Sequence, residues 1–184
     1  MSRAALSAPL HFLLCVLLLA LGSTRAVAAV EISFYSKEFG ASFPHAYVAL
    51  TGTLDRSGEK IAANYGFSAT HVSPAVLMGS VQGEVMSVDA AYLAKSDRHF
   101  SITLTDAEYD SVMATVERWR SLKQPSYHLN RQNCVFFVAH VAAALGLRAD
   151  TPKALMKKPR SYLESLGNAN RDLLTQRGAT LHRR

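Results

Sequence analysis

Alternating apolar and polar residues in the first half of the chain predict β-strands. Val30, Ile32 and Phe34 alternate with Glu31, Ser33 and Tyr35. The strands expected on this pattern and on short apolar runs are Val30–Tyr35, His45–Leu50, Ile61–Phe67, Val85–Val88 and His99–Leu104. The second and third are joined by a Gly-containing turn at residues 52–60, so we expect them to form a β-hairpin.

The register of this hairpin decides which polar side chains lie beside His45. A turn centred near Arg56 and Ser57 places Asn64 near Ala49 and Ser68 opposite His45. Side chains alternate along a strand, so Asn64 and Ser68 would then share the face of His45. A shift of one residue would move both to the other face.

Periodic apolar residues in the second half of the chain predict helices. Thr105–Glu108 is a capping box, and the residues after it bury one face as far as about Leu122. A second helix begins after Asn133 and ends near Gly146, and a short one spans Ser161–Leu166. We therefore expect an α+β domain, with an antiparallel sheet packed against the cysteine-bearing helix and the second long helix. Residues 70–83 read as a loop that could arch over a cleft.

The two ends of the chain differ from this domain. Residues 1–28 resemble a secretory signal peptide: Arg3 precedes an apolar stretch from Leu10 to Leu21, and small residues end the segment. The expected domain spans residues 29–167, and residues 168–184 are expected to form a mobile basic tail. We therefore predict export to the periplasm or the outside of the cell, with a retained membrane anchor as the alternative.

Composition narrows the classes of partner. The formal net charge of +6 falls to +4 without the predicted signal peptide. This mild excess suits contact with anionic envelope polymers, whereas the absence of a dense basic stripe disfavours nucleic acid. The sequence contains neither HExxH nor CxxC, so no metal or other cofactor is predicted.

One cysteine remains after removal of the signal peptide. Cys15 leaves with the apolar stretch, so Cys134 has no partner for an internal disulfide. Cys134 follows a polar loop and opens an apolar helix, where the positive end of the helix dipole favours the thiolate. The alternative is that Cys134 is a small, inert core residue.

A cysteine nucleophile needs a base, and His45 is the best placed of the seven histidines. It begins an apolar strand, where packing would fix its ring. His140 lies six residues along the cysteine helix, too far from the sulfur along the axis. His128 lies in a loop, and His71 and His99 remain candidates.

The order of these elements resembles the circularly permuted papain-like superfamily. The resemblance covers roughly residues 45–147: a His at the start of a strand, a polar residue on the return strand, a helix, and Tyr127 six residues before Asn133-Cys134. This group includes lecithin–retinol acyltransferase-like proteins and permuted relatives of bacterial cell-wall cysteine endopeptidases. The resemblance implies Cys134 as nucleophile, His45 as general base and Asn64 as the group that orients the base. Ser68 or His71 would replace Asn64 in another register.

These expectations combine into a proposed class of enzyme. The chain would be an exported cysteine hydrolase, an amidase or peptidase that forms a thioester intermediate, with peptidoglycan peptides as its expected substrate. The alternative is an acyltransferase or thioesterase acting on lipid acyl groups, and the third is a binding module without activity. A lipid enzyme needs a long apolar groove and a peptidase a polar cleft, so the wall of the site discriminates between them.

Overall fold

The computed structural model describes residues 29–38 and 43–182, so the predicted signal peptide lies outside the described residues. Within them, an antiparallel sheet of six strands is ordered β4-β3-β2-β1-β5-β6. The strands are β1 (Val30–Lys37), β2 (His45–Thr53), β3 (Lys60–Ala69), β4 (Gly83–Met86), β5 (Asp97–Leu104) and β6 (Thr180–Leu181). The helices are α2 (Ala75–Met78), α3 (Ala90–Ala94), α4 (Asp106–Arg120), α5 (Cys134–Ala144), α6 (Pro159–Ala169) and α7 (Arg171–Gln176).

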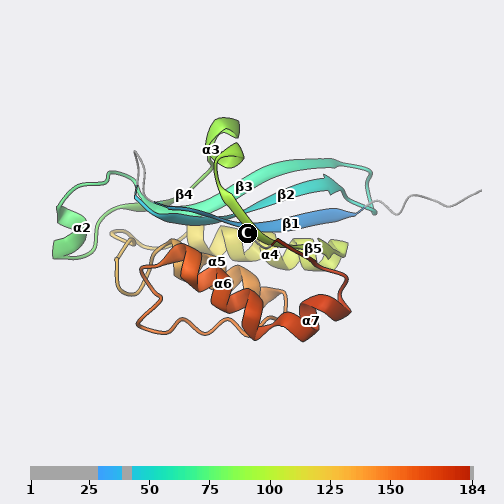
Figure 1. The fold of residues 1–184 in the computed structure, drawn as a ribbon. Helices are drawn as coiled ribbons and strands as arrows, with labels where there is room; N and C mark the ends of the chain where they lie inside the picture. Colours follow the sequence, from blue (N-terminus) through green and yellow to red (C-terminus); the bar gives the residue numbers. More distant parts are fainter. Residues whose placement is uncertain (1–28, 39–42, 183–184) are drawn as a thin grey trace, which may run out of the picture.

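The sheet is covered unequally on its two faces (Figure 1). Helices α4, α5, α6 and α7 lie on one side, whereas α3 lies on the other. The main core is on the helical side, where Ile32 and Phe34 of β1 and Val48 of β2 are fully buried. This arrangement confirms the expected α+β class, since alternate residues of each strand supply the apolar face that the helices cover.

The hairpin of β2 and β3 has the register that the sequence predicted. Ala49 pairs with Asn64, and Thr53 pairs with Lys60 across the turn. Gly58 adopts a φ of +71° in that turn, a conformation that glycine reaches without steric cost. The pairing recorded between β2 and β3 ends at Val48 and Tyr65, so the first three residues of β2 extend beyond it.

The long helix α4 begins as predicted. The Thr105 side chain accepts the N–H of Glu108, and the Glu108 carboxylate accepts the N–H of Thr105, which completes the capping box. Its buried residues include Val112, Val116 and Trp119, which face the core. The Trp119 ring packs edge-on against Phe137 of α5 at a centroid distance of 5.5 Å, so the two long helices share one core.

The C-terminal segment is folded onto the domain, which corrects the prediction of a mobile tail at residues 168–184. Helix α7 follows α6 almost directly, and Leu174 is fully buried. The Asn170 Oδ1 accepts the N–H of Arg148, and the Asn170 Nδ2 donates to the carbonyl of Arg148, at 2.8 Å each. The strand β6 then pairs with β5, and Arg177 bonds the Glu108 carboxylate at 2.6 Å, so apolar, amide and charged contacts together hold this segment on the domain.

No helix among the described residues is long and apolar enough to cross a membrane.

Candidate functional site at the end of β2

Cys134 is the first residue of α5, and Asn133 caps that helix. The Asn133 Oδ1 accepts the N–H of Val135 at 2.8 Å, and also that of Phe136 at 3.4 Å. The Asn133 backbone is extended, which is the geometry of an N-cap. The sulfur of Cys134 therefore lies beside backbone N–H groups that have no partner within the helix.

Hydrogen bonding from three backbone N–H groups lowers the pKa of the Cys134 thiol, but burial of the thiol has the larger effect. The groups belong to Ala46, Val135 and Cys134 itself, and each lowers the pKa of the thiol. Cys134 is only 6% exposed, and burial raises the pKa of the thiol to about 11. The resting group is therefore a neutral thiol, whereas the sequence had favoured a thiolate at this helix end.

Asn133 also ties the cysteine to two other segments, which makes it a strong test of this geometry. Its Nδ2 donates to the carbonyl of Leu129 at 2.7 Å and to that of Met156 at 2.9 Å. Asn133→Ala removes the cap and leaves both carbonyls without this donor, so we expect a loss of about 2–4 kcal/mol in the free energy of unfolding. Urea denaturation measures this loss. Asn130→Ala, at an exposed site in the same loop, is the matched control and should change stability by less than about 0.5 kcal/mol.

His45 is the first residue of β2, and its ring packs on the side of the sheet that carries α3. The ring stacks with Tyr47 at a centroid distance of 5.9 Å, and Tyr47 in turn contacts Tyr92 of α3. A Cβ built at Gly66 would lie 2.4 Å from Nε2 of His45, so only glycine leaves room for the ring here. Burial lowers the pKa of His45 to about 4, so the resting ring is neutral.

His45 and Cys134 therefore approach each other from different sides of the sheet. Ala46, next to His45, belongs to the core on the helical side together with Cys134, whereas His45 points toward the side of α3. They meet where β2 extends beyond its recorded pairing with β3, and both line one cavity there. Among the described residues, no hydrogen bond is recorded between the ring and the sulfur. The two groups share a cavity without forming a bonded pair in this state.

The cavity that they share has a volume of about 390 Å³ and a mainly apolar wall. The wall contains aromatic side chains, aliphatic side chains and methionines, and no carboxylate; examples are Phe67, Val76, Met86, Tyr127, Leu129 and Met156. Its volume lies within the range of about 300–1,000 Å³ usual for ligand pockets. Lys157 is the charged side chain of this wall at neutral pH. The cavity suits an apolar ligand with a polar group near Cys134.

Asn64 does not have the hydrogen bonds that the resemblance implied. Its Nδ2 donates to the carbonyl of Val88 at 3.0 Å, and its Oδ1 accepts the N–H of Val88 at 2.6 Å. Both polar atoms of the Asn64 side chain therefore bind the chain just before α3. Asn64 is not part of the cavity wall. The register prediction was right and the inferred role is corrected, because the partner of the amide comes from a segment 24 residues away in sequence.

The two alternatives to Asn64 are placed differently. Ser68 lines the cavity beside His45, and extending the hairpin register brings it opposite that residue. His71 is exposed beyond the end of β3 and does not line the cavity. Ser68 is therefore the better placed polar group to contact the His45 ring.

No role was predicted for Gly66, and residues 75–78 were expected only as part of a loop at residues 70–83 that could arch over a cleft. The ring of His45 packs against the backbone of Gly66. Helix α2 contributes Val76 and Leu77 to the cavity wall. A glycine inside a strand often marks a close approach of another group, and that signal was available at Gly66. The short apolar run at residues 75–78 gave no comparable signal, because a single helical turn has no periodicity to detect.

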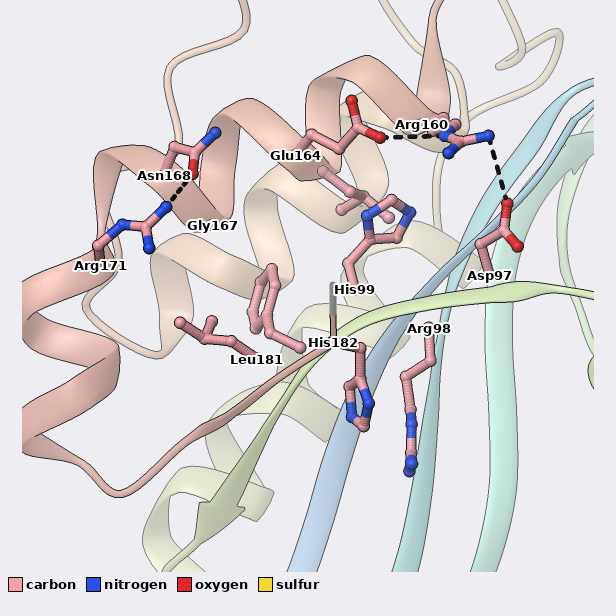
Figure 2. A pocket seen from close by; sticks show the side chains of 12 residues that line it. Asp97, Arg98, His99, Arg160, Glu164, Gly167, Asn168, Arg171, Leu181 and His182 are labelled. Atoms are coloured by element: carbon pink, nitrogen blue, oxygen red, sulfur yellow. Dashed lines mark hydrogen bonds and ion pairs between the residues drawn. The ribbon is translucent and has the colours of Figure 1, made fainter. Parts of the chain in front are cut away.

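Two of the other histidines have structural partners. His140 accepts the indole N–H of Trp119 at 3.2 Å. The His99 ring bonds the Ser36 hydroxyl at 2.8 Å and lines a second hollow of about 270 Å³ between β5 and α6 (Figure 2). In that hollow Arg160 pairs with Glu164 at 3.0 Å and with Asp97 at 3.8 Å.

No group of three or more metal-binding side chains occurs among the described residues. Comparison with protein-family models, with curated proteins and with solved structures found no match.

Proposed function

We propose that the protein is a cysteine acyl hydrolase or acyltransferase of the permuted papain-like type. An apolar acyl chain would enter the cavity at the start of β2. The observation that carries this proposal is the position of Cys134: it is the first residue of α5 and lines an apolar cavity that His45 also lines. A merely inert core cysteine needs none of these features.

The proposed chemistry uses groups of this cavity. The Cys134 sulfur attacks the acyl carbonyl carbon, and its proton passes to the His45 imidazole. The bond from the acyl carbon to the leaving group breaks, and the leaving alcohol, thiol or amine takes that proton. Water or an acceptor alcohol then releases the acyl group from the thioester. The backbone N–H of Cys134, at the start of α5, would stabilise the oxyanion, a contact worth about 2.7–4 kcal/mol in comparable enzymes.

His45 has to reach the sulfur during this cycle. The ring and the sulfur line the same cavity without a recorded hydrogen bond between them, so the ring has to leave its packing against Gly66 and Tyr47 in this mechanism. Catalytic hydrogen bonds are often long before substrate binds and shorten in the complex. A neutral imidazole with a lowered pKa is available as a base at neutral pH.

The cavity wall favours a lipid acyl group over the peptide substrate expected first. A peptide needs hydrogen-bonding partners along its backbone, whereas this wall offers mainly hydrocarbon and aromatic surface. We accordingly place a fatty acyl ester, thioester or amide ahead of a peptidoglycan peptide as the substrate class. Export remains part of the proposal on the strength of residues 1–28.

A second candidate function is storage or transfer of an apolar ligand without catalysis. It is favoured by the neutral, buried thiol and by the lack of a recorded bond between Cys134 and His45. The two functions predict the same ligand and differ in whether a covalent acyl adduct forms.

A series of acyl esters of increasing chain length tests the proposed enzyme. We expect kcat/KM to rise from acetyl to long-chain esters, because each added methylene enters the apolar cavity. Ala69 is buried in the cavity wall, and Ala69→Phe should reduce kcat/KM for the long-chain ester by about tenfold more than for the short one. Ala62→Phe, on the exposed part of the same strand, is the control. Tight binding of a fluorescent fatty acid without turnover of any ester would favour the second candidate.

A further inference from the structure

The exposed apolar side chains of the protein gather at the mouth of the cavity. In the part of the chain that the structure describes, five large hydrophobic residues are substantially exposed: Phe43 (58%), Val72 (54%), Leu77 (72%), Met78 (89%) and Met86 (40%). All except Met78 line the cavity, and Met78 is next to Leu77 on α2. They come from four separate segments, so no single local pattern accounts for their meeting at one place.

The position and charge of these exposed apolar residues suit contact with an anionic lipid surface. Helix α2 projects from one end of the sheet, away from α7 (Figure 1). Leu77 forms part of both the cavity and a neighbouring hollow, and Lys157 lines both as well. Among the described residues, no carboxylate lines either wall, and Lys157 supplies a positive charge to both. Exposed apolar side chains next to a basic group are the combination that binds a membrane interface.

We propose that this surface, defined by Phe43, Val72, Leu77, Met78 and Met86, docks on an anionic phospholipid bilayer, with the cavity opening toward the lipid. The choice of a bilayer rests on the proposed function, because a lipid acyl chain could then pass from the membrane into the cavity without crossing water. Leu77 and Met78 would enter the acyl region, and Lys157 would contact lipid phosphates. Flexible side chains at a projecting helical turn fit a surface that has no fixed shape of its own.

A local fluorescent reporter tests the docking surface. In a full chain carrying Cys15→Ser and Cys134→Ser, Met78→Cys is labelled with an environment-sensitive dye and mixed with phosphatidylcholine vesicles containing a minority of phosphatidylglycerol. We expect the emission to shift to the blue and to rise severalfold. Gln176→Cys in the same background, on the exposed part of α7, is the control and should not respond. A local readout is needed because the apolar segment at residues 10–21 would also bind vesicles.

Three outcomes would overturn this proposal. Absence of a shift at residue 78, or an equal shift at residues 78 and 176, would show that this surface does not enter the bilayer. A blue shift that grows with protein concentration in vesicle-free buffer would indicate a second copy of the chain as the occupant. A second measurement adds Leu77→Asp to the chain labelled at residue 78, which should lower the fraction of dye in the bilayer by about tenfold; an unchanged fraction would also contradict the proposal.

The proposed enzyme activity and the proposed membrane docking are tested separately, so either one can be contradicted while the other stands. The labelled chain has serine at position 134, so its docking is independent of any thioester. Docking without acyl turnover would contradict the enzyme alone, whereas turnover of soluble esters without docking would contradict the surface alone.

Discussion

Replacing Cys134 with alanine is expected to lower acyl turnover by about 10³-fold or more, because the proposed mechanism forms its acyl intermediate on the Cys134 sulfur and on no other group. The native chain, incubated with an activated long-chain ester, should gain the mass of one acyl group, and hydroxylamine should remove it. Intact-protein mass spectrometry measures both steps. Cys134→Ala should gain no acyl group.

The control for this experiment must separate chemistry from binding. Cys134→Ala should still bind a fluorescent fatty acid with an affinity close to that of the native chain, since the sulfur is a small part of an apolar wall. If the alanine variant hydrolysed the ester at the native rate, or if a different residue carried the acyl group, Cys134 would not be the nucleophile. The burial of the thiol makes iodoacetamide a slow reagent here, because a pKa near 11 leaves little thiolate at neutral pH.

The second large effect is a loss of stability in acid that depends on His45. Burial lowers its pKa from 6.5 to about 4, so between these values the unfolded chain binds a proton that the folded chain does not. The stabilising contribution is therefore complete above pH 6.5 and is lost as the pH falls to 4. The difference of about 2.5 pKa units corresponds to about 3 kcal/mol of unfolding free energy.

Urea denaturation across this pH range measures the effect. His45→Gln cannot gain the proton, so its stability should fall by about 3 kcal/mol less than that of the native chain between pH 6.5 and pH 4. Burial also lowers the pKa of His140, and His140→Gln is the control: it should retain most of the native acid sensitivity. Parallel curves for the native chain and His45→Gln would mean that the ring is not held neutral by its surroundings.

Cys134 and His45 do not form a thiolate–imidazolium ion pair in the resting site. An imidazolium beside a thiolate needs a lowered pKa at sulfur and a raised pKa at the ring, whereas burial shifts both in the opposite direction here. Burial of the ring and of the thiol disfavours the charged form of each. In the proposed mechanism, proton transfer from sulfur to ring therefore accompanies attack on the substrate rather than preceding it.

The sequence alone determined most of the secondary structure and the register of the central hairpin. Alternation in β1 and the glycine-containing turn after β2 are local features, so Ala49 and Asn64 were correctly placed opposite each other. The capping box at Thr105 and Glu108 was equally readable, because both partners lie within one helical turn. The start of α5 at Cys134 followed from a polar loop leading into an apolar run.

Only the tertiary structure decided what those residues contact. The Asn64 amide is bonded to Val88, the tail is held by Leu174 and Asn170, and the cavity wall includes a helical turn from residues 75–78. Each of these depends on groups brought together from distant parts of the chain. The same holds for the thiol of Cys134: local sequence places it at a positive helix end, but its pKa is set by burial, which is a property of the whole packed domain.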